Sequence, residues 1–186
     1  MTHYHPNLQL KNFIKVYENV LDLDVCKNII DKTDFSQFKH ATVGDEEGEG
    51  HRDEGRKCYI QRLNMDFEQK LFESIGKTLQ LYEKDFPAFY QGSEGIDTGY
   101  DHLLYKGEEK GEYVAHIDYM GVEPRLLSVS ILLNDEFDGG NFCFFDEYVM
   151  EKKVGSAVVF PSSFMFPHGV LPVSNGDRHA IVTWIR

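Results

Sequence analysis

Two potential metal ligands stand two residues apart in the segment Tyr113-Val-Ala-His116-Ile-Asp118-Tyr119. The aromatic and β-branched residues around them predict a β-strand over 112–119. Because side chains alternate between the faces of a strand, His116 and Asp118 are expected to point to the same side. A rigid element that holds an imidazole beside a carboxylate is a suitable start for a metal site.

The same letters recur in His51-Arg52-Asp53, so His-x-Asp alone is a weak signal. This second copy lies in residues 41–57, where four glycines alternate with six acidic residues. Such a segment has no apolar face to bury, and it predicts a mobile loop. A metal ligand needs a fixed direction, so we set His51 and Asp53 aside.

A third potential ligand is His168, which follows an apolar segment and Pro167 and opens the next predicted strand. In a jelly roll this later strand can return beside residues 112–119. Two histidines and one carboxylate on one face of a metal leave the opposite face open, as in non-haem Fe(II) sites. A closed zinc site would need more Cys or His ligands, and none is suitably placed.

Arg178 opens the last predicted strand, 178–185, where alternation places Arg178, Ala180, Val182 and Trp184 on one face. If that face is the interior, a buried guanidinium needs an anionic partner. Its fork binds a carboxylate bidentately, which suits a dicarboxylic co-substrate. The alternative is that Arg178 lies on the outer surface and pairs with one of the many acids.

These residues require a fold that brings distant strands together. Helices are predicted after Asp24 and, as an amphipathic segment, from Asp66 to before Pro87. From residue 97 onward, short strands alternate with turns and no crossover helices, which indicates an antiparallel sandwich or jelly roll. The predicted strands there are 98–106, 112–119, 126–134, 141–145, 156–160, 169–173 and 178–185. The fold class is therefore α+β with a β-dominated core.

Length and charge narrow the function classes. The 186 residues predict one domain, with N-terminal strands and helices in 1–96 and the core that carries the site in 97–186. A net charge of −12 argues against a nucleic-acid partner. No apolar run reaches membrane-spanning length. Three scattered cysteines favour reduced thiols, and hence a cytoplasmic location.

The segment from Tyr105 to Trp184 resembles the 2-oxoglutarate/Fe(II)-dependent oxygenase superfamily, specifically its prolyl 4-hydroxylase-like branch. Tyr105-Lys-Gly107 precedes His116-Ile-Asp118, and Gly139-Gly140 follows the central strand, as the family pattern requires. The closing signature of that pattern is matched in order by His168, Pro172-Val173, Gly176, Arg178 and Trp184. Two departures stand out: collagen-type members carry Lys in place of Arg178, and some relatives carry Tyr in place of Leu132.

The resemblance implies a double-stranded β-helix with His116, Asp118 and His168 as iron ligands. It implies that Arg178 binds the distal carboxylate of 2-oxoglutarate with help from Tyr105, and that Trp184 and Tyr119 face the substrate. Fe(II), 2-oxoglutarate and O2 would be required, with ascorbate as a reductant. Asp118 favours hydroxylation, because related halogenases lack this carboxylate.

The implied activity is hydroxylation of an unactivated C–H bond, with a prolyl residue of a peptide or protein as the first candidate. The loop at 41–57 would then be a lid over the substrate, or a solvated acidic loop without function. Three alternatives remain: the same chemistry on a free amino acid or other small molecule, a non-catalytic metal-binding jelly roll, and a cupin-like zinc or manganese enzyme. The complete set of ligands and Arg178 disfavours the last two.

Overall fold

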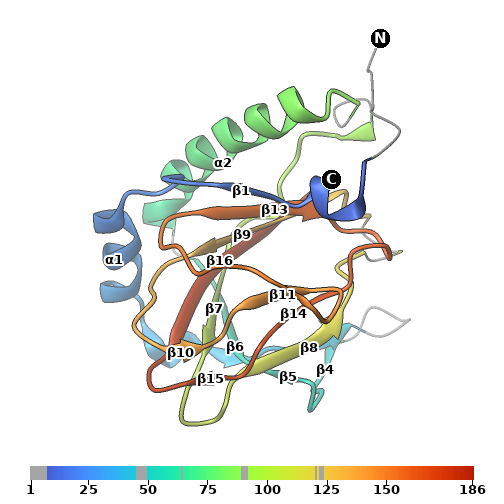
Figure 1. The fold of residues 1–186 in the computed structure, drawn as a ribbon. Helices are drawn as coiled ribbons and strands as arrows, with labels where there is room; N and C mark the ends of the chain where they lie inside the picture. Colours follow the sequence, from blue (N-terminus) through green and yellow to red (C-terminus); the bar gives the residue numbers. More distant parts are fainter. Residues whose placement is uncertain (1–7, 45–49, 64, 89–91, 120, 122–123) are drawn as a thin grey trace.

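Two antiparallel sheets form the body of the protein (Figure 1). The computed structural model describes residues 8–44, 50–63, 65–88, 92–119, 121 and 124–186. The major sheet has seven strands in the order β1-β13-β9-β16-β7-β6-β2, and the minor sheet has five in the order β12-β11-β14-β8-β5. This is a β-dominated α+β jelly roll, as predicted.

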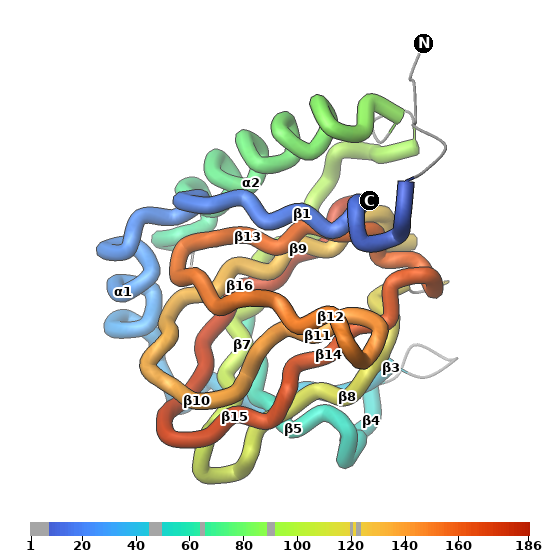
Figure 2. The backbone as a smooth tube through the Cα atoms, viewed as in Figure 1, coloured from blue at the N-terminus to red at the C-terminus, as the bar shows by residue number. Residues whose placement is uncertain are grey.

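The strands of the major sheet come from both ends of the chain. They are β1 (Lys15–Tyr17), β2 (Lys39–His40), β6 (Tyr59–Arg62), β7 (Asp101–Tyr105), β9 (Leu127–Leu132), β13 (Ala157–Pro161) and β16 (Arg178–Ile185). Figure 2 shows the N-terminal β1 lying beside β13, although more than a hundred residues separate them.

The minor sheet carries the strands that hold the two candidate histidines. Its members are β5 (Arg56–Lys57), β8 (Glu112–His116), β11 (Phe142–Phe144), β12 (Tyr148–Val149) and β14 (His168–Val170). Two short pairs complete the described strands, β3 (Val43–Gly44) with β4 (Gly50–His51) and β10 (Asp138–Gly139) with β15 (Val173–Ser174).

Helices α1 (Leu23–Asp31) and α2 (Met65–Asp85) cover the outer face of the major sheet (Figure 1). One side of α2 buries Leu71, Ile75, Leu79 and Tyr82 against apolar strand residues in the largest core cluster. Two single-turn 3-10 helices, Leu10–Phe13 and Phe35–Gln37, lie nearby in the chain. In the described part of the chain, no helix combines the length and the hydrophobicity needed to span a membrane.

Strand β9 contributes one face to the core under the helices and the other face to the main cavity. Its residues Leu127, Val129 and Ile131 belong to the core cluster under the helices. The alternate residues Ser128 and Ser130 line the main cavity on the opposite face. The strand is buried throughout, so its polar face is enclosed in the protein.

Several element boundaries differ from the sequence prediction. The residues 13–20 favour a first strand by composition, but the strand is confined to Lys15–Tyr17, and Leu10–Phe13 forms a 3-10 helix. Helix α1 begins at Leu23, so Asp24 lies in its first turn and Asp22 is the N-cap. Likewise, Asp66 lies inside the first turn of α2, where a carboxylate favours the helix dipole.

The segment 41–57, predicted as a loop, contains short strands where it is described. Val43–Gly44 pairs with Gly50–His51, and Arg56–Lys57 pairs with β8. Residues 45–49 lie outside the described residues. The pairing of Arg56 with Tyr113 brings this segment to the edge of the sheet that carries His116.

Candidate metal centre

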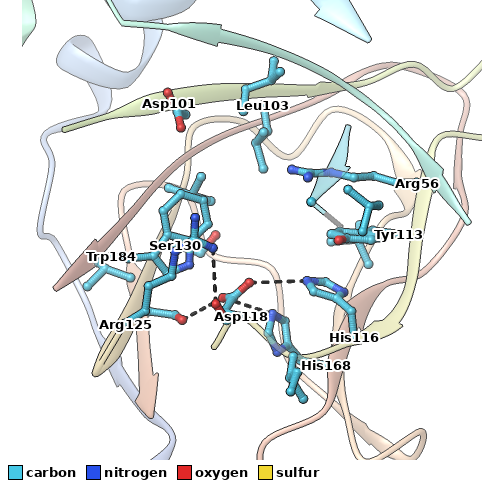
Figure 3. Close-up of a pocket in the computed structure, with 18 of the residues that line it drawn as sticks. Arg56, Asp101, Leu103, Tyr113, His116, Asp118, Arg125, Ser130, His168 and Trp184 are labelled. Carbon is cyan, nitrogen blue, oxygen red and sulfur yellow. Dashed lines mark hydrogen bonds and ion pairs between the residues drawn. The ribbon is translucent and has the colours of Figure 1, made fainter. Parts of the chain in front are cut away.

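A cavity of about 430 Å³ opens between the two sheets, and the three predicted ligands lie on its wall (Figure 3). His116 comes from the end of β8 and His168 from the start of β14, and these two residues are paired in the register of the minor sheet. The strand predicted over 112–119 ends at His116, so Asp118 lies two residues beyond β8. The potential ligand atoms of the three residues lie within 4.8 Å of one another.

Both imidazoles are oriented by a hydrogen bond from Nδ1 to a backbone carbonyl oxygen. Nδ1 of His116 lies 2.9 Å from the carbonyl oxygen of Val114, and Nδ1 of His168 lies 3.0 Å from that of Phe166. A carbonyl only accepts, so each Nδ1 carries the proton and donates it. Nε2 of each ring faces Asp118, at 3.6 Å from Oδ1 for His116 and 3.4 Å from Oδ2 for His168, and is the atom that would bind a metal. This is how metal-binding histidines are usually fixed.

The carboxylate of Asp118 is also held from behind. The Ser128 hydroxyl donates to Oδ2 at 2.7 Å and lies 2.8 Å from the Ser162 hydroxyl. Arg125 donates from Nη1 to the backbone carbonyl of Asp118 at 3.3 Å. Carboxylate and backbone of the same residue are therefore both anchored, although Asp118 lies outside a strand.

The electrostatics suit a cation. Burial alone would raise the pKa of Asp118, but the neighbouring His116 and His168 outweigh it and hold that pKa well below the ordinary value. Burial lowers the pKa of His116. An ionised carboxylate beside a neutral imidazole is the protonation state that metal binding requires.

Aromatic rings restrict the histidines further. Tyr113 stacks on His116 with ring centroids 3.5 Å apart and an interplanar angle of 18°. Phe142 stacks on His168 at 5.3 Å, and Phe160 contacts the same ring edge-on at 4.6 Å. These contacts limit ring rotation, so the three ligand atoms keep their directions.

Arg178 is in the interior, as one of the two sequence interpretations required. It is 4% exposed and is paired in register with Tyr105, whose ring its guanidinium covers at 5.1 Å. Its Nε has no hydrogen-bond partner, and no ion pair to it is formed by the described residues. Burial lowers its pKa.

Arg178 does not line the cavity on whose wall the three candidate ligands lie. Tyr105 lines the main cavity, whereas Arg178 lines a smaller adjoining one of about 30 Å³. Ser130 and Phe142 line both cavities and therefore form the boundary between them. The guanidinium lies behind this boundary.

The two remaining predicted site residues also line the main cavity. Trp184 lies on its wall beneath the Arg125 guanidinium, 3.7 Å from the ring centroid. Tyr119 is half exposed at the cavity edge. Figure 3 shows Arg125 and Trp184 on one side of the cavity and Arg56 and Tyr113 on the other.

Sequence reasoning missed Arg56, Arg125 and Ser128. Arg56 lies in the segment that was predicted to be a loop, so its pairing with β8 had no signal. Ser128 did have one, because it alternates with Ser130 on the interior face of an otherwise apolar strand.

The other described histidines lie away from the site. His51 and Asp53 are exposed, and neither belongs to the cluster of potential ligands found among the described residues. His102 is fully buried, with its Nε2 2.9 Å from Nδ1 of His179. His179 thus faces away from Arg178, as alternation predicted. His3 and His5 lie outside the described residues.

The sequence of this chain was compared with family models and with known proteins. Residues 101–186 match the model of the 2OG-Fe(II) oxygenase superfamily. Prolyl 3-hydroxylase 1 of Homo sapiens and that of Rattus norvegicus are each 40% identical over 63 residues. The match covers 31% of this chain and 9% of each relative, so the chain spans only a small part of their length.

Solved structures share the fold. The viral collagen prolyl hydroxylase of Paramecium Bursaria Chlorella virus-1, in a 2OG complex, has a TM-score of 0.70 at 15% identity, over 94% of this chain and 96% of that one. A Trichoplax adhaerens prolyl hydroxylase in complex with a hypoxia inducible factor peptide fragment has a TM-score of 0.71 at 16% identity, over 94% and 83%. A Pseudomonas putida prolyl-4-hydroxylase has a TM-score of 0.65 at 19% identity, over 94% and 92%.

The family model covers all the strands of the core from β7 onward, including the three candidate ligands and Arg178. The predicted similarity to the 2-oxoglutarate/Fe(II)-dependent oxygenase superfamily is confirmed over residues 101–186, and the prolyl hydroxylase structures share the fold of this chain.

Proposed function

We propose that this protein is a 2-oxoglutarate- and Fe(II)-dependent dioxygenase that hydroxylates an unactivated C–H bond. The observation that carries the proposal is the cluster of His116, Asp118 and His168 on the wall of a cavity next to a buried, unpaired Arg178. The three clustered side chains are a metal-ligand set, and the Arg178 guanidinium is a binding group for an anion.

His116, Asp118 and His168 are the proposed metal ligands. Two imidazole nitrogens and one carboxylate suit Fe(II) better than Mg²⁺ or Ca²⁺, which prefer oxygen ligands alone. All three side chains are pre-oriented, by the carbonyls of Val114 and Phe166 and by the Ser128 hydroxyl. When bound, iron would couple the oxidative decarboxylation of 2-oxoglutarate by O2 to substrate hydroxylation, with ascorbate as a reductant.

Arg178 is proposed to bind the distal carboxylate of 2-oxoglutarate. A buried guanidinium without an anionic partner is costly, and a bidentate carboxylate removes that cost. Tyr105, paired with Arg178 across β7 and β16, is placed to donate its hydroxyl to the same carboxylate. Since Ser130 and Phe142 stand between the two cavities, we expect Phe142 to change its rotamer when the co-substrate binds.

A prolyl residue of a peptide or protein is the proposed target. The family match, the prolyl 3-hydroxylase relatives and the prolyl hydroxylase structures support it, and the Trichoplax structure was solved with a peptide. Trp184 and Tyr119 are proposed to contact this substrate, since both line the cavity that the ligands face. A cytoplasmic location stays a prediction that rests on the three unpaired cysteines.

The experiment is anaerobic reconstitution with Fe(II) and 2-oxoglutarate, followed by exposure to O2 with a panel of proline-rich peptides and free amino acids. Succinate release and the mass of each candidate substrate are measured. We expect succinate in stoichiometric ratio to a product that is heavier by one oxygen atom. Absence of succinate under every condition, with an Asp118→Ala variant that binds iron as the native protein does, would contradict the proposal.

A further inference from the structure

The main cavity carries a second guanidinium that the proposed chemistry does not use, that of Arg56. The residue is half-buried on β5, and its side chain reaches into the cavity beside Tyr113 (Figure 3). Its guanidinium carbon lies 4.7 Å from the centroid of the Tyr113 ring, which in turn stacks on His116. Two successive stacking contacts therefore connect Arg56 to a proposed metal ligand.

No described carboxylate forms an ion pair with this cation. Arg56 donates from Nη1 to the carbonyl oxygen of Thr42, and its Nε is buried without a partner. Its closest electrostatic partners are uncharged at neutral pH: the thiol of Cys58 and the phenols of Tyr113 and Tyr105. Asp101 also lines the cavity and interacts electrostatically with Arg56, but its ion pair is with Arg62 at 3.3 Å, and Arg62 and Arg125 are its stronger partners.

The charges of the co-substrate are already accounted for. Under the proposed function, one carboxylate of 2-oxoglutarate binds the metal and the other binds Arg178. Arg125 is engaged with the Trp184 ring and with the carbonyl of Asp118. Arg56 thus lines the same cavity as the metal cluster, with the Tyr113 ring between its guanidinium and His116, and its Nε is left for another acceptor. A guanidinium fork in a partly enclosed site selects for a carboxylate.

We infer that Arg56 binds a carboxylate of the primary substrate, so that the target is a residue with a free α-carboxylate: a free amino acid or the C-terminal residue of a peptide. This inference rests on the proposed dioxygenase chemistry and replaces an internal prolyl residue as its target by a residue whose α-carboxylate is free. Because only the Tyr113 ring separates Arg56 from His116, we expect the bound carboxylate and the hydroxylated carbon to belong to the same residue. An internal peptide position offers only a neutral carbonyl there and leaves the cation unpaired.

The test uses matched acid and amide probes and measures binding without turnover. The protein is loaded with Mn(II) and 2-oxoglutarate without O2, and calorimetry measures the affinity for N-acetyl-L-proline and N-acetyl-L-prolinamide. The corresponding pair of leucine derivatives shows whether the preference extends beyond proline. Variants are Arg56→Gln, Arg56→Lys and the control Lys57→Gln. Lys57 adjoins Arg56 on β5, but it forms a surface ion pair with Glu112 at 2.6 Å.

We expect the native protein and Lys57→Gln to bind at least one acid about tenfold or more tightly than its amide, as one charge-assisted bidentate contact provides. In Arg56→Gln the preference disappears, whereas Arg56→Lys retains part of it. Affinity for 2-oxoglutarate is unchanged in Arg56→Gln and falls in Arg178→Gln.

Three results overturn the inference. They are an equal or absent affinity for every acid and amide in the native protein, a preference that survives Arg56→Gln, and a loss of 2-oxoglutarate affinity in Arg56→Gln equal to that in Arg178→Gln. The last would place Arg56 in the co-substrate site. A native protein that binds neither Mn(II) nor 2-oxoglutarate contradicts the proposed function instead, so the two failures are distinguishable.

Discussion

At the scale of single residues, the site depends on directions more than on residue types. His51-Arg52-Asp53 and His116-Ile-Asp118 have the same donor letters. Only the second pair has its imidazole fixed by a backbone carbonyl and its carboxylate fixed by a serine hydroxyl. A ligand that is already oriented loses little conformational entropy when a metal binds, and this difference can be measured.

Asp118→Asn should abolish tight metal binding while leaving the side-chain volume unchanged. Loss of a residue that only supports a ligand costs about 10–100-fold in metal affinity, so loss of the anionic ligand itself should cost more than about 100-fold. Calorimetric titration with Mn(II) measures it. Asp53→Asn is the matched control and should bind as the native protein does; similar losses in both variants would show that neither motif is a specific site.

Ser128→Ala should weaken metal binding by about tenfold without abolishing it. The Ser128 hydroxyl is a hydrogen-bond donor to Asp118 at 2.7 Å, and its removal frees the carboxylate to rotate. Ser130→Ala, on the same face of β9, removes a hydroxyl of equal size and should leave the affinity unchanged. If both variants lose affinity equally, the effect comes from cavity volume rather than from the hydrogen bond.

At the scale of elements, the close pairing of β8 and β14 brings His116 and His168 together. Gly169, next to His168, makes this approach feasible. A Cβ built at Gly169 would lie 2.5 Å from the carbonyl oxygen of Tyr113, on the partner strand. The contact is with backbone, so only separation of the strands can relieve it.

Gly169→Ala should therefore destabilise the fold by about 1–3 kcal/mol and weaken metal binding. Urea unfolding and Mn(II) titration measure the two effects. Gly76→Ala is the control: Gly76 lies inside helix α2, and a Cβ added there would meet nothing within 4 Å, so alanine should stabilise by about 0.5–1 kcal/mol. A neutral Gly169→Ala would mean that the two strands are not held as closely as described.

At the scale of the whole molecule, a buried histidine pair couples stability to pH. Burial lowers the pKa of His102 to about 3 and that of His179 to about 4. The two rings share a hydrogen bond, and Thr33 contacts the other nitrogen of His102 at 3.2 Å. Both are neutral in the folded protein at neutral pH.

The unfolded chain binds protons on these histidines near pH 6.5, whereas the folded chain does not until near pH 3–4. Stability should therefore fall as the pH drops below about 6.5, by about 2 kcal/mol for each imidazole at pH 5. Urea unfolding at pH 7.5 and pH 5 measures this. His102→Gln should reduce the difference between the two pH values; an unchanged difference would assign it to other groups.

The sequence was sufficient to predict the elements with a clear hydrophobic periodicity and the residues with metal-binding side chains. Strands such as 178–185 and the amphipathic helix that became α2 follow from periodicity. His116 and Asp118 were found by residue type in a predicted strand, although Asp118 lies beyond its observed end, and His168 was found by its place before a later strand. Arg56 could not be found in this way, because the pairing of the 41–57 segment with β8 is a long-range contact without a local pattern. Arg125 lies in irregular chain before β9, and its contacts with Trp184 and Asp118 also depend on the tertiary fold. The position of Arg178 behind Ser130 and Phe142 depends on packing that no single strand encodes.

The most direct test of the central claim is anaerobic titration of the Fe(II)-loaded protein with 2-oxoglutarate, followed by visible absorption. A 2-oxo acid that chelates Fe(II) gives a charge-transfer band. We predict a band that saturates at one iron and one 2-oxoglutarate per chain, is absent in Asp118→Ala and needs about tenfold or more 2-oxoglutarate in Arg178→Gln. A native protein without the band, or an Asp118→Ala variant that gives it unchanged, would contradict the assignment of this site.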